Sequence, residues 1–133
     1  MKLTIPCLLV LALLVASLSG CDTGPGEPKK YPISGEVTLD SQPLPDGMIY
    51  FKDIAAGTAD SAEIKDGKFA GQAEAGQRRI EIFAYRTEVS SMGDVQTETK
   101  VNTLPPRFNS ESTLTEAVTA AGPNTFKFET TSK

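Results

Sequence analysis

The feature of this sequence that most restricts its fold is a two-residue alternation of apolar and polar side chains. In the segment 33–39, the polar residues Ser34, Glu36 and Thr38 alternate with apolar residues and a glycine. Successive side chains of a strand point to opposite faces, so this pattern predicts a half-buried strand. Other short segments have the same character and are also expected to be strands: 48–52, 62–65, 68–70, 78–87, 113–119 and 125–130.

Turn-forming residues separate these segments. They include DSQPLPDG at 40–47, Asp66-Gly67 and AGPN at 121–124. Glycine adopts positive φ at little cost, and aspartate can hydrogen-bond its own backbone. The pattern predicts about seven short strands and no helix in the domain. The expected fold is all-β, a seven-stranded antiparallel β-sandwich, with a small barrel as the alternative.

The segment 78–87 is the clearest strand. Ile80, Ile82 and Ala84 are predicted to face the core, while Phe83 and Tyr85 point the other way. Apolar residues on both faces indicate a central strand whose outer face is partly covered. The inward residues of the last two strands are expected to be Leu114 and Val118, then Phe126 and Phe128.

The segment 88–106 is long, polar and rich in weak strand formers. It is predicted to be a loop, with a short edge strand possible at 97–101. Loops of this length are uncommon in small domains unless they are functional or disordered. This one is therefore a candidate lid over a ligand site.

The N-terminus has the pattern of an export signal. Lys2 precedes an apolar stretch over 5–16, which is too short to cross a membrane comfortably, and small residues follow it. The string Leu18-Ser19-Gly20-Cys21 resembles the bacterial lipobox, in which signal peptidase cuts before a cysteine that carries diacylglycerol. An ordinary secretory signal that happens to contain a cysteine is the alternative. The resemblance implies that Cys21 is acylated, with an additional palmitate-like chain on its amino group.

This interpretation divides the chain into three parts. Residues 1–20 are the helical lipoprotein signal peptide, residues 21–30 are the lipidated cysteine and a flexible tether, and residues 31–133 are the β-sandwich domain. The tether sequence DTGPGEPKK has no apolar side chain with which to pack. Cys21 would anchor the protein to the cell membrane or outer membrane, facing the periplasm or the exterior. Asp22 favours the inner membrane by analogy with known sorting systems.

Composition excludes several classes of function. The chain has no histidine, which removes a His general base, a Ser-His or Cys-His pair and His metal ligands. The net charge is −4, which argues against a nucleic-acid partner. Of two cysteines, Cys7 lies in the signal segment, so the mature chain can form no internal disulfide. We expect no enzyme activity and no cofactor.

A few residues are candidates for partner binding. Tyr85 and Arg86, with Phe83, could form a ligand-binding strip on the outer face of a sheet. The favoured interpretation is that Tyr85 and Phe83 pack under the long loop, where aromatic rings bury a large area. Arg107, in the string Pro105-Pro106-Arg107-Phe108-Asn109, could present its guanidinium to an anionic group, although Phe108 plugging the core while Arg107 points outward is the favoured interpretation.

Four aspartates raise the question of a metal. Asp40, Asp46, Asp53 and Asp60 are scattered through neighbouring loops, where carboxylates could bind calcium. No D-x-D-x-D-G string is present, and aspartate is also a common turn residue. No metal site is therefore predicted.

The order of the segments resembles a known family. The strings YPISGEVTLDSQPLPDGMIYF, AEIKDGKFAGQAEAGQRRIEIFAYR and LPPRFNSESTLTEAVTAAGPNTFKFET resemble bacterial lipoproteins with transthyretin-like or carboxypeptidase-regulatory-like domains. The likeness covers almost all of 31–133 and implies a non-catalytic sandwich. Hydroxyisourate hydrolases have a related fold, but they use histidines and a conserved C-terminal tetrapeptide, whereas this chain ends in Thr-Thr-Ser-Lys.

Two functions follow as expectations. The first is a membrane-anchored envelope lipoprotein whose domain is an interaction or structural module for an envelope protein or polymer. The second is a small-ligand-binding lipoprotein with the 88–106 loop as its lid.

Overall fold

The computed structural model describes residues 26–133, so the predicted signal peptide, Cys21 and Asp22 lie outside the described residues. Within 26–133, no helix has the length and apolar character needed to cross a membrane. The all-β prediction is confirmed for this part of the chain. Its elements are β1 Lys30–Leu39, β2 Gln42–Pro43, β3 Asp46–Asp53, β4 Thr58–Lys65, β5 Lys68–Glu74, β6 Gly76–Met92, β7 Val95–Asn102, the 3₁₀ turn η1 Pro106–Phe108, β8 Thr115–Val118 and β9 Asn124–Thr130.

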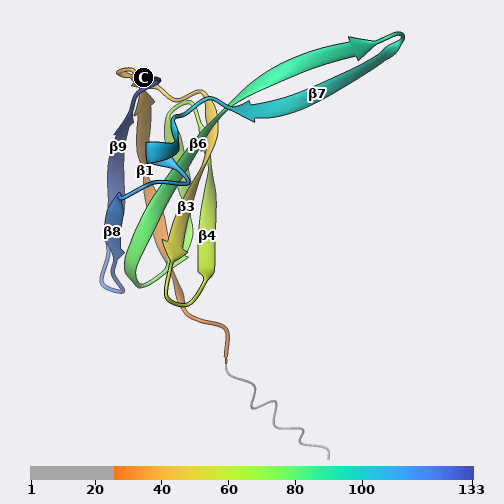
Figure 1. The fold of residues 1–133 in the computed structure, drawn as a ribbon. Coiled ribbons are helices and arrows are strands. Elements are labelled where there is room, and N and C mark those ends of the chain that lie inside the picture. The colour runs from red at the N-terminus through yellow and green to blue at the C-terminus, as the bar shows by residue number, and fades with distance from the viewer. Residues whose placement is uncertain (1–25) are drawn as a thin grey trace, which may run out of the picture.

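These strands form one curled sheet with two facing layers (Figure 1). One layer has the order β9-β1-β5, and the other has the order β4-β3-β6-β8. The layers join at the β4–β5 hairpin, whose strands pair only at Ile64↔Phe69 and Lys65↔Lys68. Beyond these pairs the two strands form no further ladder pairs, although a Cβ at Gly71 would lie 3.1 Å from Ala62 Cβ. The sheet folds over on itself at this point.

The core fills the space between the layers. Ile49, Phe51, Ile80 and Ile82 from one layer are fully buried. The predicted inward residues of the other layer meet them: the ring of Phe51 lies 6.2 Å from Phe69 and 5.6 Å from Phe126, centroid to centroid. Each large apolar side chain removed from water contributes roughly 1.5–3 kcal/mol before the entropy cost of folding. The period-two prediction of the core is confirmed at these positions.

Three sequence predictions are corrected. The sheet is not purely antiparallel, because β1 and β9 pair in parallel, from Ile33↔Asn124 to Leu39↔Thr130. Leu114 is 36% exposed and precedes β8, and Val118 alone of the predicted pair is buried. The tether ends one residue early, because Lys30 already belongs to β1.

The largest correction concerns the predicted loop at 88–106. Most of it is a β-hairpin: β6 continues to Met92, a two-residue turn follows, and β7 returns from Val95 to Asn102. Figure 1 shows this hairpin projecting from the body of the domain. The possible edge strand at 97–101 is the middle of β7. We call residues 85–102 the arm.

Gly35 in β1 allows close packing within the β9-β1-β5 layer. An added Cβ would overlap the carbonyl oxygen of Phe126 and come within 2.7 Å of the Phe69 ring. We expect Gly35→Ala to lower the free energy of unfolding by about 2 kcal/mol, because strands β9 and β5 must both shift. Urea unfolding followed by circular dichroism measures this change.

Gly26→Ala is the matched control, because nothing lies within 4 Å of the position of its added Cβ. Equal unfolding midpoints for the two variants would contradict the packing argument.

Candidate functional site

Most residues of the arm are exposed to solvent. β3 accompanies β6 only as far as Ala84, and beyond that residue β6 pairs with β7 alone. Three apolar side chains stand open to solvent on it: Val89 is 57% exposed, Met92 is 86% exposed and Val95 is 65% exposed. An isolated two-stranded hairpin is at best marginally stable in water, and exposed apolar groups are typical of binding surfaces.

The base of the arm is firmly attached to the body. Lys100 Nζ lies 3.0 Å from Asp46 Oδ2, and this hydrogen bond raises the pKa of the Lys100 ammonium. Asn102 Oδ1 accepts hydrogen bonds from the backbone N–H groups of Ala84 (3.2 Å) and Leu104 (3.1 Å). The arm therefore leaves the body in a fixed direction, while its tip makes no such contact with the rest of residues 26–133.

A row of aromatic rings leads along the outer face of the sheet to this base. Tyr50 meets Phe83 edge-on at 5.6 Å, and Phe83 stacks on Tyr85 at 6.4 Å, centroid to centroid. A lysine flanks each end: Lys52 Nζ lies 5.9 Å from the Tyr50 ring and Lys100 Nζ lies 5.7 Å from the Tyr85 ring. We call Tyr50, Phe83 and Tyr85 the aromatic strip. Such rings offer large contact area with little loss of side-chain entropy.

The two ends of the aromatic strip differ in their electrostatic surroundings. Burial raises the pKa of the Tyr85 phenol above its ordinary value. Beside Tyr50, Glu81 is only 2% exposed and contacts Lys52 at 2.6 Å and Arg79. Burial opposes its charge, but the hydrogen bonds and charges of the two cations still lower the pKa of Glu81. One end of the strip is therefore a fixed cluster of ion pairs.

The three predicted partner-binding residues do not converge. Tyr85 joins the aromatic strip as expected for the outer face. Arg86, the next residue of β6, points to the opposite face of the strand and pairs with Glu88. Arg107 lies in η1, stacks 4.7 Å from the centroid of Phe108, and hydrogen-bonds Thr131 Oγ1 at 2.6 Å and the carbonyl of Lys133.

The string around Arg107 is structural. Asn109 is buried and its amide donates to the carbonyl oxygens of Pro105 (3.1 Å) and of Ile82 and Leu104 (both 3.4 Å). Phe108 packs against the core, as expected. This segment therefore fastens the end of the arm to β6.

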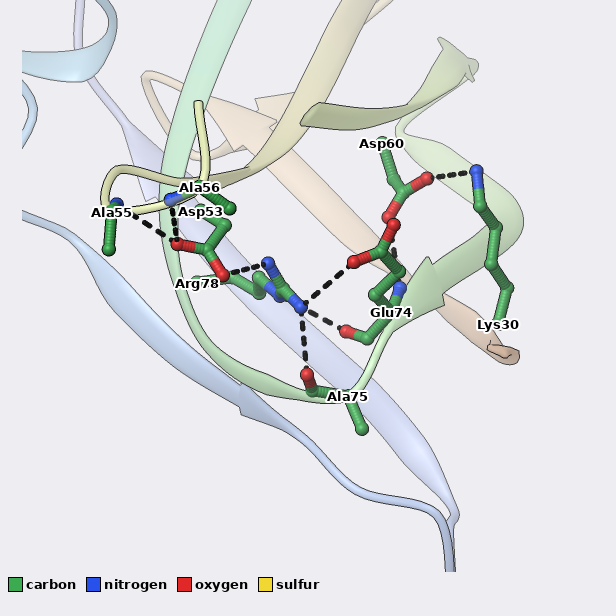
Figure 2. A network of polar contacts seen from close by, with 8 residues as sticks. All are labelled: Lys30, Asp53, Ala55, Ala56, Asp60, Glu74, Ala75 and Arg78. Atoms are coloured by element: carbon green, nitrogen blue, oxygen red, sulfur yellow. Dashed lines mark hydrogen bonds and ion pairs between the residues drawn. The ribbon is translucent and has the colours of Figure 1, made fainter. Parts of the chain in front are cut away.

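A network of charges lies at the pole where the chain enters β1 (Figure 2). Arg78 is only 4% exposed; its guanidinium lies 3.0 Å from Asp53 and 3.5 Å from the Glu74 carboxylate. It also donates to the carbonyls of Glu74 (3.1 Å) and Ala75 (2.8 Å). Its donors are occupied by groups of the same domain, so the network joins three chain segments and does not offer a binding site.

The four candidate calcium ligands are separated. Asp40 accepts hydrogen bonds from Ser132, Asp46 pairs with Lys100, and Asp53 pairs with Arg78. Asp60 contacts Lys30 Nζ at 2.5 Å and accepts a 2.9 Å bond from the Glu74 N–H. Within residues 26–133, no three acidic or cysteine side chains converge as metal ligands.

Two open grooves lie on the outer face of the β9-β1-β5 layer. The larger, of about 820 Å³, is floored by Gly35 and Ala70 and rimmed by Lys68 and Lys127. The smaller, of about 520 Å³, lies beside it near the turn before β9. Neither is lined by any residue of the arm.

Sequence reasoning missed the exposed residues Met92 and Val95 and the third ring, Tyr50. One signal for the arm was present: Gly93-Asp94 is a two-residue string of the type that closes hairpins, and Gly93 has φ +64°. Tyr50 was predicted to lie in a strand, but its meeting with Phe83 depends on the register between β3 and β6.

No family model, curated protein or solved structure matches this chain.

The charge network should make the free energy of unfolding depend on pH in the acid range. The N–H of Ala56 holds the pKa of Asp53 below its usual range, with help from Arg78 and the N–H of Ala55 and against partial burial. A lowered pKa stabilises the fold above the unfolded-state pKa, and this stability is lost as pH falls through the folded-state pKa. We expect Asp53→Asn to be less stable than the wild type at about pH 7, and the difference to shrink below about pH 4.

Urea unfolding of both proteins at neutral and acid pH measures this difference. Asp94→Asn, in the exposed turn of the arm, is the control and should follow the wild type throughout. An Asp53→Asn deficit that stays constant from neutral to acid pH would disprove the ionic contribution.

Proposed function

We propose that this chain is a lipid-anchored cell-envelope protein whose β domain is a non-catalytic interaction module. The arm and the aromatic strip are its partner-binding surface. The observation that carries this proposal is the arm itself: a hairpin fixed at its base, exposed on both faces and bearing Val89, Met92 and Val95 toward solvent.

The anchor rests on the sequence. The apolar segment, the small residues and Cys21 are in the register of a lipobox. Two or more acyl chains hold a protein stably at a membrane, whereas one chain binds only marginally. The membrane lipid is then the first partner, through Cys21, and an envelope protein or polymer is the second.

The arrangement of the domain supports this assignment. Figure 1 shows the chain entering β1 at one pole and the arm leaving near the opposite pole. A domain tethered by its N-terminus would hold the arm on the side away from the anchor. This is the orientation in which an arm can reach a partner.

The finer fold assignment is part of the proposal. Setting aside the short β2 and the arm strand β7, the strands of the body form layers of three and four in the orders β9-β1-β5 and β4-β3-β6-β8. A seven-stranded transthyretin-like sandwich of the carboxypeptidase-regulatory-like kind is consistent with these orders and with the motif resemblance. The parallel β1–β9 pair is included in that arrangement.

A non-catalytic role is supported by chemistry. The whole sequence lacks histidine, and the charged groups of the Arg78 and Glu81 clusters are engaged with one another. A lid function for 88–106 is not proposed, because the segment projects as an arm and lines neither outer groove. Lys100 alone of this segment borders a smaller hollow, beside Asp46 and Glu63.

The test is capture of partners from detergent-solubilised envelope. The core cluster lies within residues 31–128, so the segment 26–133 contains every strand and serves as bait. We expect the double variant Met92→Ser/Val95→Ser to lose the captured partners. The matched control is Ile54→Ser, because Ile54 is also exposed (60%) but lies in the β3–β4 turn. Equal capture by both variants would remove the arm tip from the binding surface.

The anchor has its own test. Cys21→Ser should release the protein into the aqueous phase of a detergent partition, and the acyl mass should vanish from the chain, because the acyl-accepting thiol is gone. Cys7→Ser, in the apolar part of the leader, should leave the protein in the detergent phase. A wild-type chain without acyl mass would contradict the proposal of a lipoprotein.

A further inference from the structure

The outer edge of β7 is an unpaired strand edge. β7 pairs with β6 over eight residue pairs, from Tyr85↔Asn102 to Met92↔Val95, and with no other strand of residues 26–133. We propose that this edge binds the same edge of a second copy of the chain, forming an antiparallel dimer centred on Thr99. This inference rests on the proposed role of the arm as a binding surface, and it identifies the partner that binds there.

The backbone of β7 has the correct groups facing outward. The pair that flanks the two-residue turn, Met92↔Val95, exchanges backbone hydrogen bonds, and such pairs alternate along an antiparallel ladder. Thr97 and Thr99 therefore use their backbone groups toward β6. The N–H and C=O groups of Gln96, Glu98, Lys100 and Asn102 point away from β6, toward the open edge.

Charge selects one register for self-pairing. With Thr99 opposite Thr99, Glu98 of each copy lies opposite Lys100 of the other, and both pairs are in hydrogen-bonding positions. Shifting one copy by two residues in one direction places Glu98 opposite Glu98. Shifting it by two residues in the other direction places Lys100 opposite Lys100. Directly opposed like charges destabilise a sheet, whereas opposite charges stabilise it. The edge is thus complementary to itself, as a twofold interface requires.

The second face of β7 adds to this fit. Its residues are all β-branched: Val95, Thr97, Thr99 and Val101. In the proposed register, Thr99 of one chain packs against Thr99 of the other, and Thr97 lies opposite Val101 of the other chain. A strand edge without proline or a bulge keeps its backbone groups open to another strand. β7 contains no proline, and its pairing with β6 shows no interruption.

Lys100 can take part without leaving its present position. It already contacts Asp46 and lies over the Tyr85 ring. An ammonium has three donors, so Glu98 of the other copy can share it. The dimer would then lock the base of one arm against the middle of the other.

The test is disulfide crosslinking of the full chain in membranes. Thr99 of the two copies would occupy a non-hydrogen-bonded pair, with Cα atoms about 4.5 Å apart, which a disulfide can bridge. Thr97→Cys is the control, because two copies of residue 97 would lie about 13 Å apart along the strands. We expect about tenfold more crosslinked dimer with Thr99→Cys than with Thr97→Cys, because a disulfide needs Cα atoms within about 7 Å. The unsubstituted chain measures any contribution from Cys21.

Charge exchange tests the register. In the Thr99→Cys background, Glu98→Lys alone should lose the crosslink, since two lysines would face two lysines. Lys100→Glu alone should also lose it. Co-expression of the two single variants with different tags should restore a crosslink between differently tagged chains. Both lysines of the Glu98→Lys copy then lie opposite the two glutamates of the Lys100→Glu copy.

The outcomes separate this inference from the proposed function. Equal crosslinking at positions 97 and 99, or none at either, overturns the dimer. If that happens while the arm still captures envelope proteins, the arm is a binding surface for another partner and only its occupant was wrong. Restored crosslinking between the charge variants would support both the dimer and its register.

Discussion

The whole architecture depends on how little β4 and β5 pair. A hairpin with only two residue pairs lets a single sheet turn back on itself, so the inward faces of β3 and β6 meet those of β1 and β9. Ile64 and Phe69, which form one of those pairs, are both buried and lie at the fold line of the core. Because the core closes inside this curl, the outer faces and the ends of the strands remain available for other roles.

The two poles of the domain are built differently. At the pole where the chain enters, Arg78 pairs with Asp53, and Asp60 pairs with Lys30 and accepts a hydrogen bond from the Glu74 N–H. At the other pole, neutral groups such as Asn102 and Asn109 hold the base of the arm by hydrogen bonds to backbone. Ion pairs hold the first end together, whereas amide hydrogen bonds and the Lys100–Asp46 ion pair together support the arm at the other.

The sequence was informative where one face of a strand is buried. Ile80, Ile82 and Ala84 alternate with outward residues, and all three are buried as expected. The same rule fails in the arm, because both faces of 88–101 meet solvent and no apolar alternation is needed there. Side-chain alternation also carries no information about strand direction, so the parallel pairing of β9 could not be read from Phe126 and Phe128. The aromatic strip could not be predicted, because it depends on the register between β3 and β6, and the sequence of neither strand specifies that register alone.

The parallel pair of β1 and β9 has a consequence for the order of folding. It joins the first strand to the last, and the buried Asn124 reaches back 92 residues to donate to the carbonyl of Pro32. Contacts of this separation carry an entropy cost, because a long loop must close before they are made. A nascent chain therefore cannot complete its β9-β1-β5 layer until β9 has been synthesised. Removal of β9 would therefore expose the edge of β1 along its whole paired length, Ile33 to Leu39.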